Sequence, residues 1–99
     1  MTYVVTWRYA IGDEKVADRQ VAVARPVWLK HGAKSLRCYG IGSGPNIGQW
    51  IIVAEFPDAA TFGRAQDAVR QSGEFQSWTA ANRAAKNIPV DCSHLRERT

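Results

Sequence analysis

The order of its hydrophobic patterns constrains the fold of this chain more than any other feature. Runs rich in β-branched and aromatic residues predict strands, and apolar residues spaced three and four apart predict helices. In order, the 99 residues predict a strand at 2–9, a helix at 14–31, strands at 34–41 and 48–56, an interrupted helix between 58 and 85, and a strand at 86–94. This order is typical of a two-layer α+β domain with helices on one face of a sheet.

The strand expected at 48–56 is the most apolar segment. The residues from Trp50 to Ala54 form a continuous apolar run, which indicates burial on both faces. Helices in a two-layer domain cover only one face of the sheet, so the other face needs a different cover. A domain of this size also buries a modest share of its surface, which favours association. We therefore expect a homodimer in which a second copy covers the open face.

Single residues predict where some elements begin, bend or lie. Asp13 and Asp58 are expected to cap the N-termini of the helices, because aspartate accepts hydrogen bonds from free backbone N–H groups. Pro26 lies inside the first helical pattern, and it predicts a kink or break near Arg25 because proline lacks an N–H group. Pro89 cannot donate to a β-ladder, so the last strand is expected at an edge of the sheet.

The composition describes one ordinary globular domain over residues 1–99, with 45% hydrophobic and 22% charged residues. The formal charge is +4, but the arginines are spread along the chain, so we expect no nucleic-acid partner. The two cysteines show no CxxC spacing, which favours reduced thiols and a cytoplasmic protein. No apolar stretch approaches the ~20 residues of a membrane span, so we expect no membrane association.

An RNA-binding module is an alternative, since RRM domains have the same order of elements. Their third strand carries a basic–Gly–aromatic–small–aromatic pattern with exposed rings. Residues 48–55 lack the leading basic residue and the later aromatics, and Glu55 would repel phosphate. The glycine-rich residues 42–46 also lack the Lys-Ser/Thr ending of a phosphate-binding loop. The sequence therefore argues against both kinds of site.

The candidate general base is His31, at the expected end of the first helix. The alternative is that His31 interacts with the negative end of the helix dipole, as its neighbour Lys30 would. His94 alternates with apolar residues on the last strand and is interpreted as an interface or surface residue. No HxH or HxxxH spacing connects the two histidines, so no metal site is expected.

Arg8 is the candidate for binding an acidic ligand through bidentate hydrogen bonds. The alternative is a structural pair with Glu55, because the first and third strands are expected to be neighbours. Cys38 and Cys92 have no nearby catalytic constellation in the sequence and are interpreted as packing residues.

Four tryptophans are the strongest candidates for a ligand pocket. Such large, amphipathic side chains fill a core, an interface or a cavity. The cavity alternative would suit a flat apolar ligand, and an asparagine one turn after Trp78 would add a polar contact. The predicted pocket residues are Trp7, Arg8, Trp28, Trp50, Trp78 and Asn82.

The sequence resembles the dimeric α/β-barrel superfamily, most clearly from Glu55 to Phe62 and from Gln71 to Trp78. These segments combine a strand ending in an acidic–aromatic pair, a helix with an early phenylalanine, and a small–acidic–Phe–x–x–Trp pattern. The chain is most similar to the NIPSNAP-like and antibiotic-biosynthesis-monooxygenase-like branches. The resemblance implies a ferredoxin-like βαββαβ subunit whose antiparallel sheet faces that of a second subunit, forming a dimeric α/β barrel.

The resemblance also implies a pocket between helices and sheet and, in the monooxygenase-like branch, oxidation without a cofactor. The haem-degrading members use Asn, Trp and His at positions that match Trp7 or Arg8, Val69 and Thr79 here, so haem is not expected. We therefore expect no cofactor, a small apolar, aromatic or acidic ligand, and monooxygenase-like chemistry. The alternative is a non-catalytic regulatory or stress-related dimer.

Overall fold

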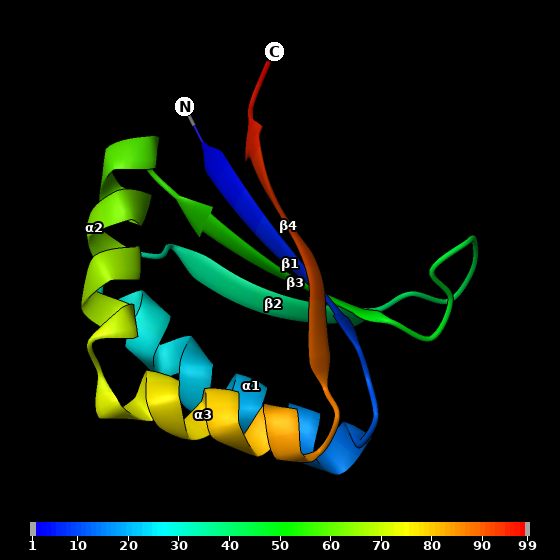
Figure 1. Cartoon of the computed structure of the whole chain (residues 1–99). Coiled ribbons are helices and arrows are strands. Elements are labelled where there is room, and N and C mark those ends of the chain that lie inside the picture. The colour runs from blue at the N-terminus through cyan, green and yellow to red at the C-terminus, as the bar shows by residue number, and fades with distance from the viewer. Residues whose placement is uncertain (1, 99) are drawn as a thin grey trace.

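The computed structural model describes residues 2–98, which form a four-stranded antiparallel sheet and three helices (Figure 1). The strands lie in the order β2-β3-β1-β4 across the sheet. Along the chain, the elements are β1 (Tyr3–Ala10), α1 (Glu14–Lys30), β2 (Ser35–Gly40), β3 (Trp50–Phe56), α2 (Ala59–Arg70), α3 (Gly73–Ala84) and β4 (Ile88–Arg96). The predicted βαββαβ order and ferredoxin-like α+β fold are confirmed, with the second helix divided into α2 and α3.

All three helices lie on one side of the sheet (Figure 1). Alternate side chains of a strand point to opposite faces, and those of the central strands that face the helices form the core. Val5 of β1 and Ala54 and Phe56 of β3 are fully buried there. Phe62 and Val69 of α2 belong to the same hydrophobic cluster. The core therefore lies between the central strands and the helical layer.

The opposite face of the sheet has no helix over it within residues 2–98 (Figure 1). The side chains of Ile51 and Val53 alternate with the residues of β3 that face the helices, and they are only half-buried on this open face. Toward the edges of the sheet, Tyr39 and Leu95 are 49% and 51% exposed. The prediction that the third strand carries apolar residues on both faces is thus confirmed, apart from Glu55.

Side-chain caps explain where the helices begin. Asp13 Oδ1 accepts a hydrogen bond from the N–H of Val16 at 3.1 Å, and Asp58 Oδ1 accepts one from the N–H of Thr61 at 2.7 Å. The two hydrogen bonds from Thr61 lower the pKa of Asp58, since they stabilise its charged form. Both predicted caps are confirmed. Ser72 caps α3 in the same way, which places the boundary between α2 and α3.

Of the kink or break predicted near Arg25, the break does not occur, because α1 continues through Pro26 to Lys30. Proline removes one backbone hydrogen bond, to the carbonyl four residues earlier. That carbonyl belongs to Ala22, and both Ala22 and Pro26 are exposed. Water can therefore replace the missing donor, while the inner side of α1 keeps Trp28 buried.

The last strand lies at the edge of the sheet, as Pro89 predicts. β4 pairs with β1, and its register shifts between Arg8 and Tyr9. All nine residues of β4 are exposed. The helical layer therefore leaves this edge of the sheet open. Among the described residues, no helix has the length and apolar character needed to cross a bilayer.

Candidate functional site

A cavity of about 90 Å³ lies between the sheet, α1 and α3. A single water molecule needs about 10–15 Å³ on such a measure, so the cavity has room for several waters or a small organic group. Its walls are mostly apolar. They are formed by Trp7, Tyr9, Ile11, Ala17, Gln20, Val21, Ala24, Trp28, Leu36, Trp50, Ile52, Phe75, Trp78, Asn82 and Asn87.

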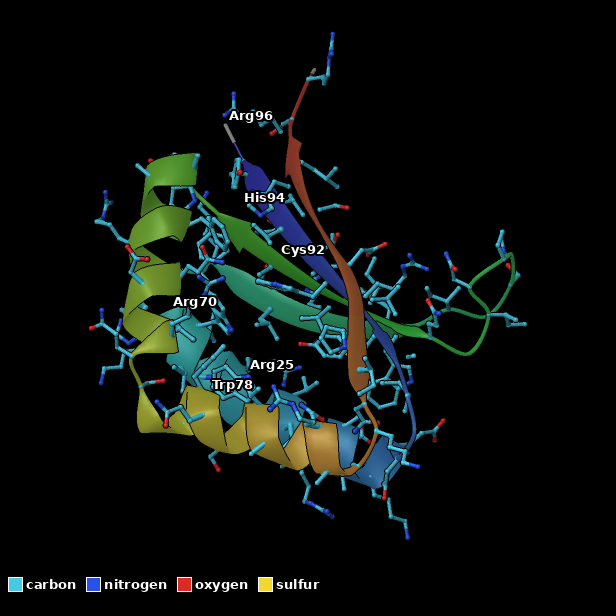
Figure 2. The ribbon with its side chains drawn as sticks, in the orientation of Figure 1. Arg25, Arg70, Trp78, Cys92, His94 and Arg96 are labelled. Atoms are coloured by element: carbon cyan, nitrogen blue, oxygen red, sulfur yellow. The ribbon has the colours of Figure 1, made fainter. Side chains whose placement is uncertain are left out.

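Four different elements each contribute one tryptophan to this cavity. Trp7 comes from β1, Trp28 from α1, Trp50 from β3 and Trp78 from α3. Trp28 and Trp78 are only 7% and 8% exposed, so the helical side of the cavity is largely closed to solvent. The rings of Trp7 and Trp28 lie 5.3 Å apart and bridge the sheet and helix layers. Figure 2 shows Trp78 on α3, between that helix and the sheet.

A second cavity of about 280 Å³ adjoins the first, between α3 and the start of β4. The two share Tyr9, Trp78, Asn82 and Asn87 as lining residues. The outer cavity adds Thr79, Arg83, Ile88 and Pro89. The two cavities thus adjoin, and the outer one includes a charged side chain, that of Arg83. We refer to them below as the inner cavity and the outer cavity.

Asn87 fixes the wall where the cavities meet. Its Oδ1 accepts hydrogen bonds from the N–H groups of Gly12 and Asp13, and its Nδ2 donates to Asp13 O and Asn82 Oδ1. Asn87 is 1% exposed, and these bonds satisfy both ends of its amide. They tie the turn after β1 to the end of α3, and they use the oxygen of Asn82.

The polar groups of the two linings are mainly hydrogen-bond donors and neutral amides. Burial raises the pKa of Tyr9, so its hydroxyl stays protonated at neutral pH and can donate a hydrogen bond. Neither lining contains a carboxylate or a histidine, and Arg83 is the charged residue of the outer cavity. The site can therefore hold and orient an apolar molecule, but its walls offer no carboxylate or imidazole base.

Five predicted pocket residues, Trp7, Trp28, Trp50, Trp78 and Asn82, are brought together in the inner cavity. His31 is not among the residues that line either cavity. It is the C-cap of α1, and its backbone N–H donates to the carbonyl groups of Trp28 and Leu29. This location agrees with the alternative interpretation of His31 as a helix-end residue. The proposal of a general base at His31 therefore has no support from the geometry.

Arg8 also lies away from both cavities, because it alternates with Trp7 on β1 and points to the open face. It forms a salt bridge with Asp91 across β1 and β4, and its Nη1 donates to Gln49 Oε1 at 2.8 Å. The guanidinium lowers the pKa of Asp91. The expected pair with Glu55 is wrong, since the register places Ile51 opposite Arg8 on β3.

Other candidates lie along the exposed edge strand. Figure 2 shows Cys92, His94 and Arg96 spaced along β4. His94 Nδ1 and the hydroxyl of Tyr3 are hydrogen-bonded at 2.8 Å, and the His94 ring lies edge-on to Phe62 at 5.0 Å. Burial raises the pKa of Cys92, which disfavours the reactive thiolate. Within residues 2–98, no group of three or more potential ligands could hold a metal ion.

Some polar lining residues were not predicted from the sequence, among them Tyr9, Gln20, Arg83 and Asn87. Tyr9 carried a usable signal, since it follows Trp7 by two positions on one strand and must share its face. Arg83 follows Asn82 directly, but a sequence does not show which of two adjacent helical side chains faces a cavity. Nothing in the local sequence distinguished Asn87 from a solvated turn residue.

Comparison with solved structures shows the same fold in several proteins. SnoaB, a cofactor-independent oxygenase from Streptomyces nogalater, matches with a TM-score of 0.64 and 15% identity, over 99% of this chain and 94% of that one. A protein from Bordetella bronchiseptica, provisionally named an antibiotic biosynthesis monooxygenase, gives 0.70 and 17%, over 99% and 98%. An uncharacterized NIPSNAP domain protein from Burkholderia xenovorans gives 0.70 and 16%, over 97% and 94%.

No protein-family model matches the chain, and no curated protein matches it by sequence. The shared fold spans almost the full length of each compared chain. At the level of fold, the resemblance to the monooxygenase-like and NIPSNAP-like branches is therefore confirmed.

Proposed function

We propose that this protein binds a small, mainly apolar aromatic molecule in the inner cavity. The observation that carries the proposal is the convergence of four tryptophans from four elements on one space. Ligand sites are typically concave and apolar, with a few placed polar groups, and here Tyr9, Gln20 and Asn82 supply those groups. Aromatic walls stack favourably on flat rings, while a purely structural core would close around them.

The binding test uses a substitution that fills the inner cavity and leaves its polar groups unchanged. Ala24 of α1 lines the cavity and is half-buried, whereas Ala22 on the same helix is exposed and does not line it. With 2-naphthamide as the probe, wild-type protein is expected to show a raised melting temperature and quenched tryptophan fluorescence. Ala24→Leu should lose both responses because the added methyl groups occupy the cavity, and Ala22→Leu should keep them. Equal binding by both variants would place the ligand elsewhere.

We further propose that the protein oxygenates this ligand without a cofactor, because SnoaB, which has this fold, is a cofactor-independent oxygenase. One fold hosts many functions, so this assignment needs its own measurement. Compounds that bind are tested with an oxygen electrode. Oxygen uptake that requires both protein and ligand, and that falls in Ala24→Leu, would support an enzyme. Tight binding without oxygen uptake would favour the non-catalytic regulatory dimer.

An RNA-binding function gains no support from the position of the rings. Single-stranded RNA stacks on aromatic side chains of an exposed sheet face. On β3, the ring of Trp50 lines the inner cavity, and the open face carries Ile51, Val53 and Glu55. The face that RNA would use is therefore aliphatic and partly acidic at its central strand.

The open sheet face supports a homodimer as part of the proposal. Ile51 lies on this face near the start of β3, between Arg8 and Tyr39 on the neighbouring strands. Wild-type protein is expected to sediment as a dimer of the 11.0 kDa chain at micromolar concentration. Ile51→Lys should be monomeric, since it would bury an unpaired charge in the interface.

Val23→Lys is the matched control for the dimer, because Val23 is an exposed apolar residue on α1, away from the open face. It should sediment as the wild type does. A wild-type protein that stays a monodisperse monomer at micromolar concentration would contradict the dimer. Binding to the inner cavity would be unaffected by that result.

A further inference from the structure

Arg83, an exposed residue, gives the outer cavity a positive charge that no other described residue neutralises. It lies in the last turn of α3 and lines the outer cavity beside Asn82. Among residues 2–98, the one salt bridge joins Arg8 to Asp91, so no described carboxylate lies within 4.0 Å of Arg83. The linings of both cavities contain no acidic side chain. An arginine without a described acidic partner therefore lies beside the mostly apolar inner cavity.

The neighbouring polar groups are donors as well. Tyr9 lines both cavities, and burial keeps its hydroxyl in the protonated, donating form. Asn82 uses its Oδ1 to accept from Asn87 Nδ2 at 3.1 Å, which leaves its own NH₂ group as the available end. Hydrogen bonds from charged donors to anionic oxygens are about twice as strong as neutral ones. Cation and donors together select for an oxygen acceptor with negative charge.

We propose that the ligand is an aromatic acid or phenolate, with its ring in the inner cavity and its anionic oxygen in the outer cavity against Arg83. This rests on the proposed function and specifies its substrate class. The shared residues Tyr9, Trp78 and Asn82 connect the two cavities, so one molecule can reach both.

The test uses two probes of the same shape, one charged and one neutral. It also compares two arginines that each lie in the last turn of a helix. The probes are 2-naphthoate and its neutral isostere 2-naphthamide, with dissociation constants measured by tryptophan fluorescence. Arg70 occupies the last turn of α2 as Arg83 does in α3, but lines neither cavity. Arg83→Gln should weaken naphthoate binding about threefold to tenfold and leave naphthamide binding unchanged. Arg70→Gln should change neither constant.

The possible outcomes distinguish the proposal of an aromatic ligand in the inner cavity from the proposal that this ligand is an anion bound by Arg83. A wild-type preference for naphthoate that disappears in Arg83→Gln, and that shrinks with added salt, supports the anionic ligand. If both probes bind equally well to wild type and to Arg83→Gln, the cavity binds aromatic molecules but the inference about charge is wrong. If neither probe binds to wild type, the proposed function fails along with it. An equal loss in Arg70→Gln would show a general effect of charge and would contradict a site at Arg83.

Discussion

Replacing Asn87 with alanine is expected to lower the free energy of unfolding by about 2–4 kcal/mol, because it removes four part-buried hydrogen bonds at once. Asn87 Oδ1 accepts from Gly12 and Asp13 at 2.8 and 2.9 Å, and its Nδ2 donates to Asp13 O and to Asn82 Oδ1 at 3.1 Å each. At 1% exposure, the site admits little water to replace those bonds. Urea unfolding followed by circular dichroism measures the loss.

Two further variants separate the parts of this network. Asn87→Asp keeps an oxygen acceptor for the N–H groups of Gly12 and Asp13, but its second oxygen would face the acceptors Asp13 O and Asn82 Oδ1 and its charge would be buried. At neutral pH it should therefore be destabilised at least as much as Asn87→Ala. Asn82→Ala removes only one of the two hydrogen bonds that Asn87 Nδ2 donates, so it should lower the stability least. A loss in Asn87→Ala no larger than that in Asn82→Ala would show that the junction does not depend on Asn87.

This junction also shows what the sequence could not predict. The partners of Asn87 lie 74 and 75 residues away along the chain. The approach is so close that a Cβ atom on Gly12 would lie 2.5 Å from the carbonyl oxygen of Ala85. Such contacts depend on how the turn after β1 packs against the end of α3. Local patterns of hydrophobicity do not predict that packing.

The elements and their order were predictable because each depends on local patterns. The alternation of β1 and the helical spacing around Trp78 were enough to select most tryptophans of the inner cavity. The predicted roles of Arg8 and His31 instead depended on what lies across from them. The register of β1 places Asp91 opposite Arg8, and His31 is held at the end of α1 by backbone hydrogen bonds. The surroundings of Arg8 and His31 thus depend on tertiary structure, which local sequence patterns do not show.

Replacing Phe62 with alanine is expected to cost about 3–5 kcal/mol of unfolding free energy, since it deletes a buried aromatic ring and leaves a cavity. Phe62 of α2 is 4% exposed and is the ring with the most aromatic neighbours. Its centroid lies 5.1 Å from Phe56 and 6.3 Å from Trp28, which stacks nearly parallel to it. Tyr3, Trp7 and His94 are its other ring partners. Thermal and urea unfolding measure the effect.

The same substitution should weaken ligand binding, although Phe62 does not line the inner cavity. Trp7 and Trp28 form two of its walls, and both pack on Phe62, so removing that ring frees them to move. Phe62→Leu keeps most of the apolar volume and should retain more stability and binding.

Phe75→Ala is the control for the stability effect, because Phe75 is half-buried and lines the inner cavity itself. It should lose less stability than Phe62→Ala, and the reverse order would mean that the core is centred on α3 instead of α2.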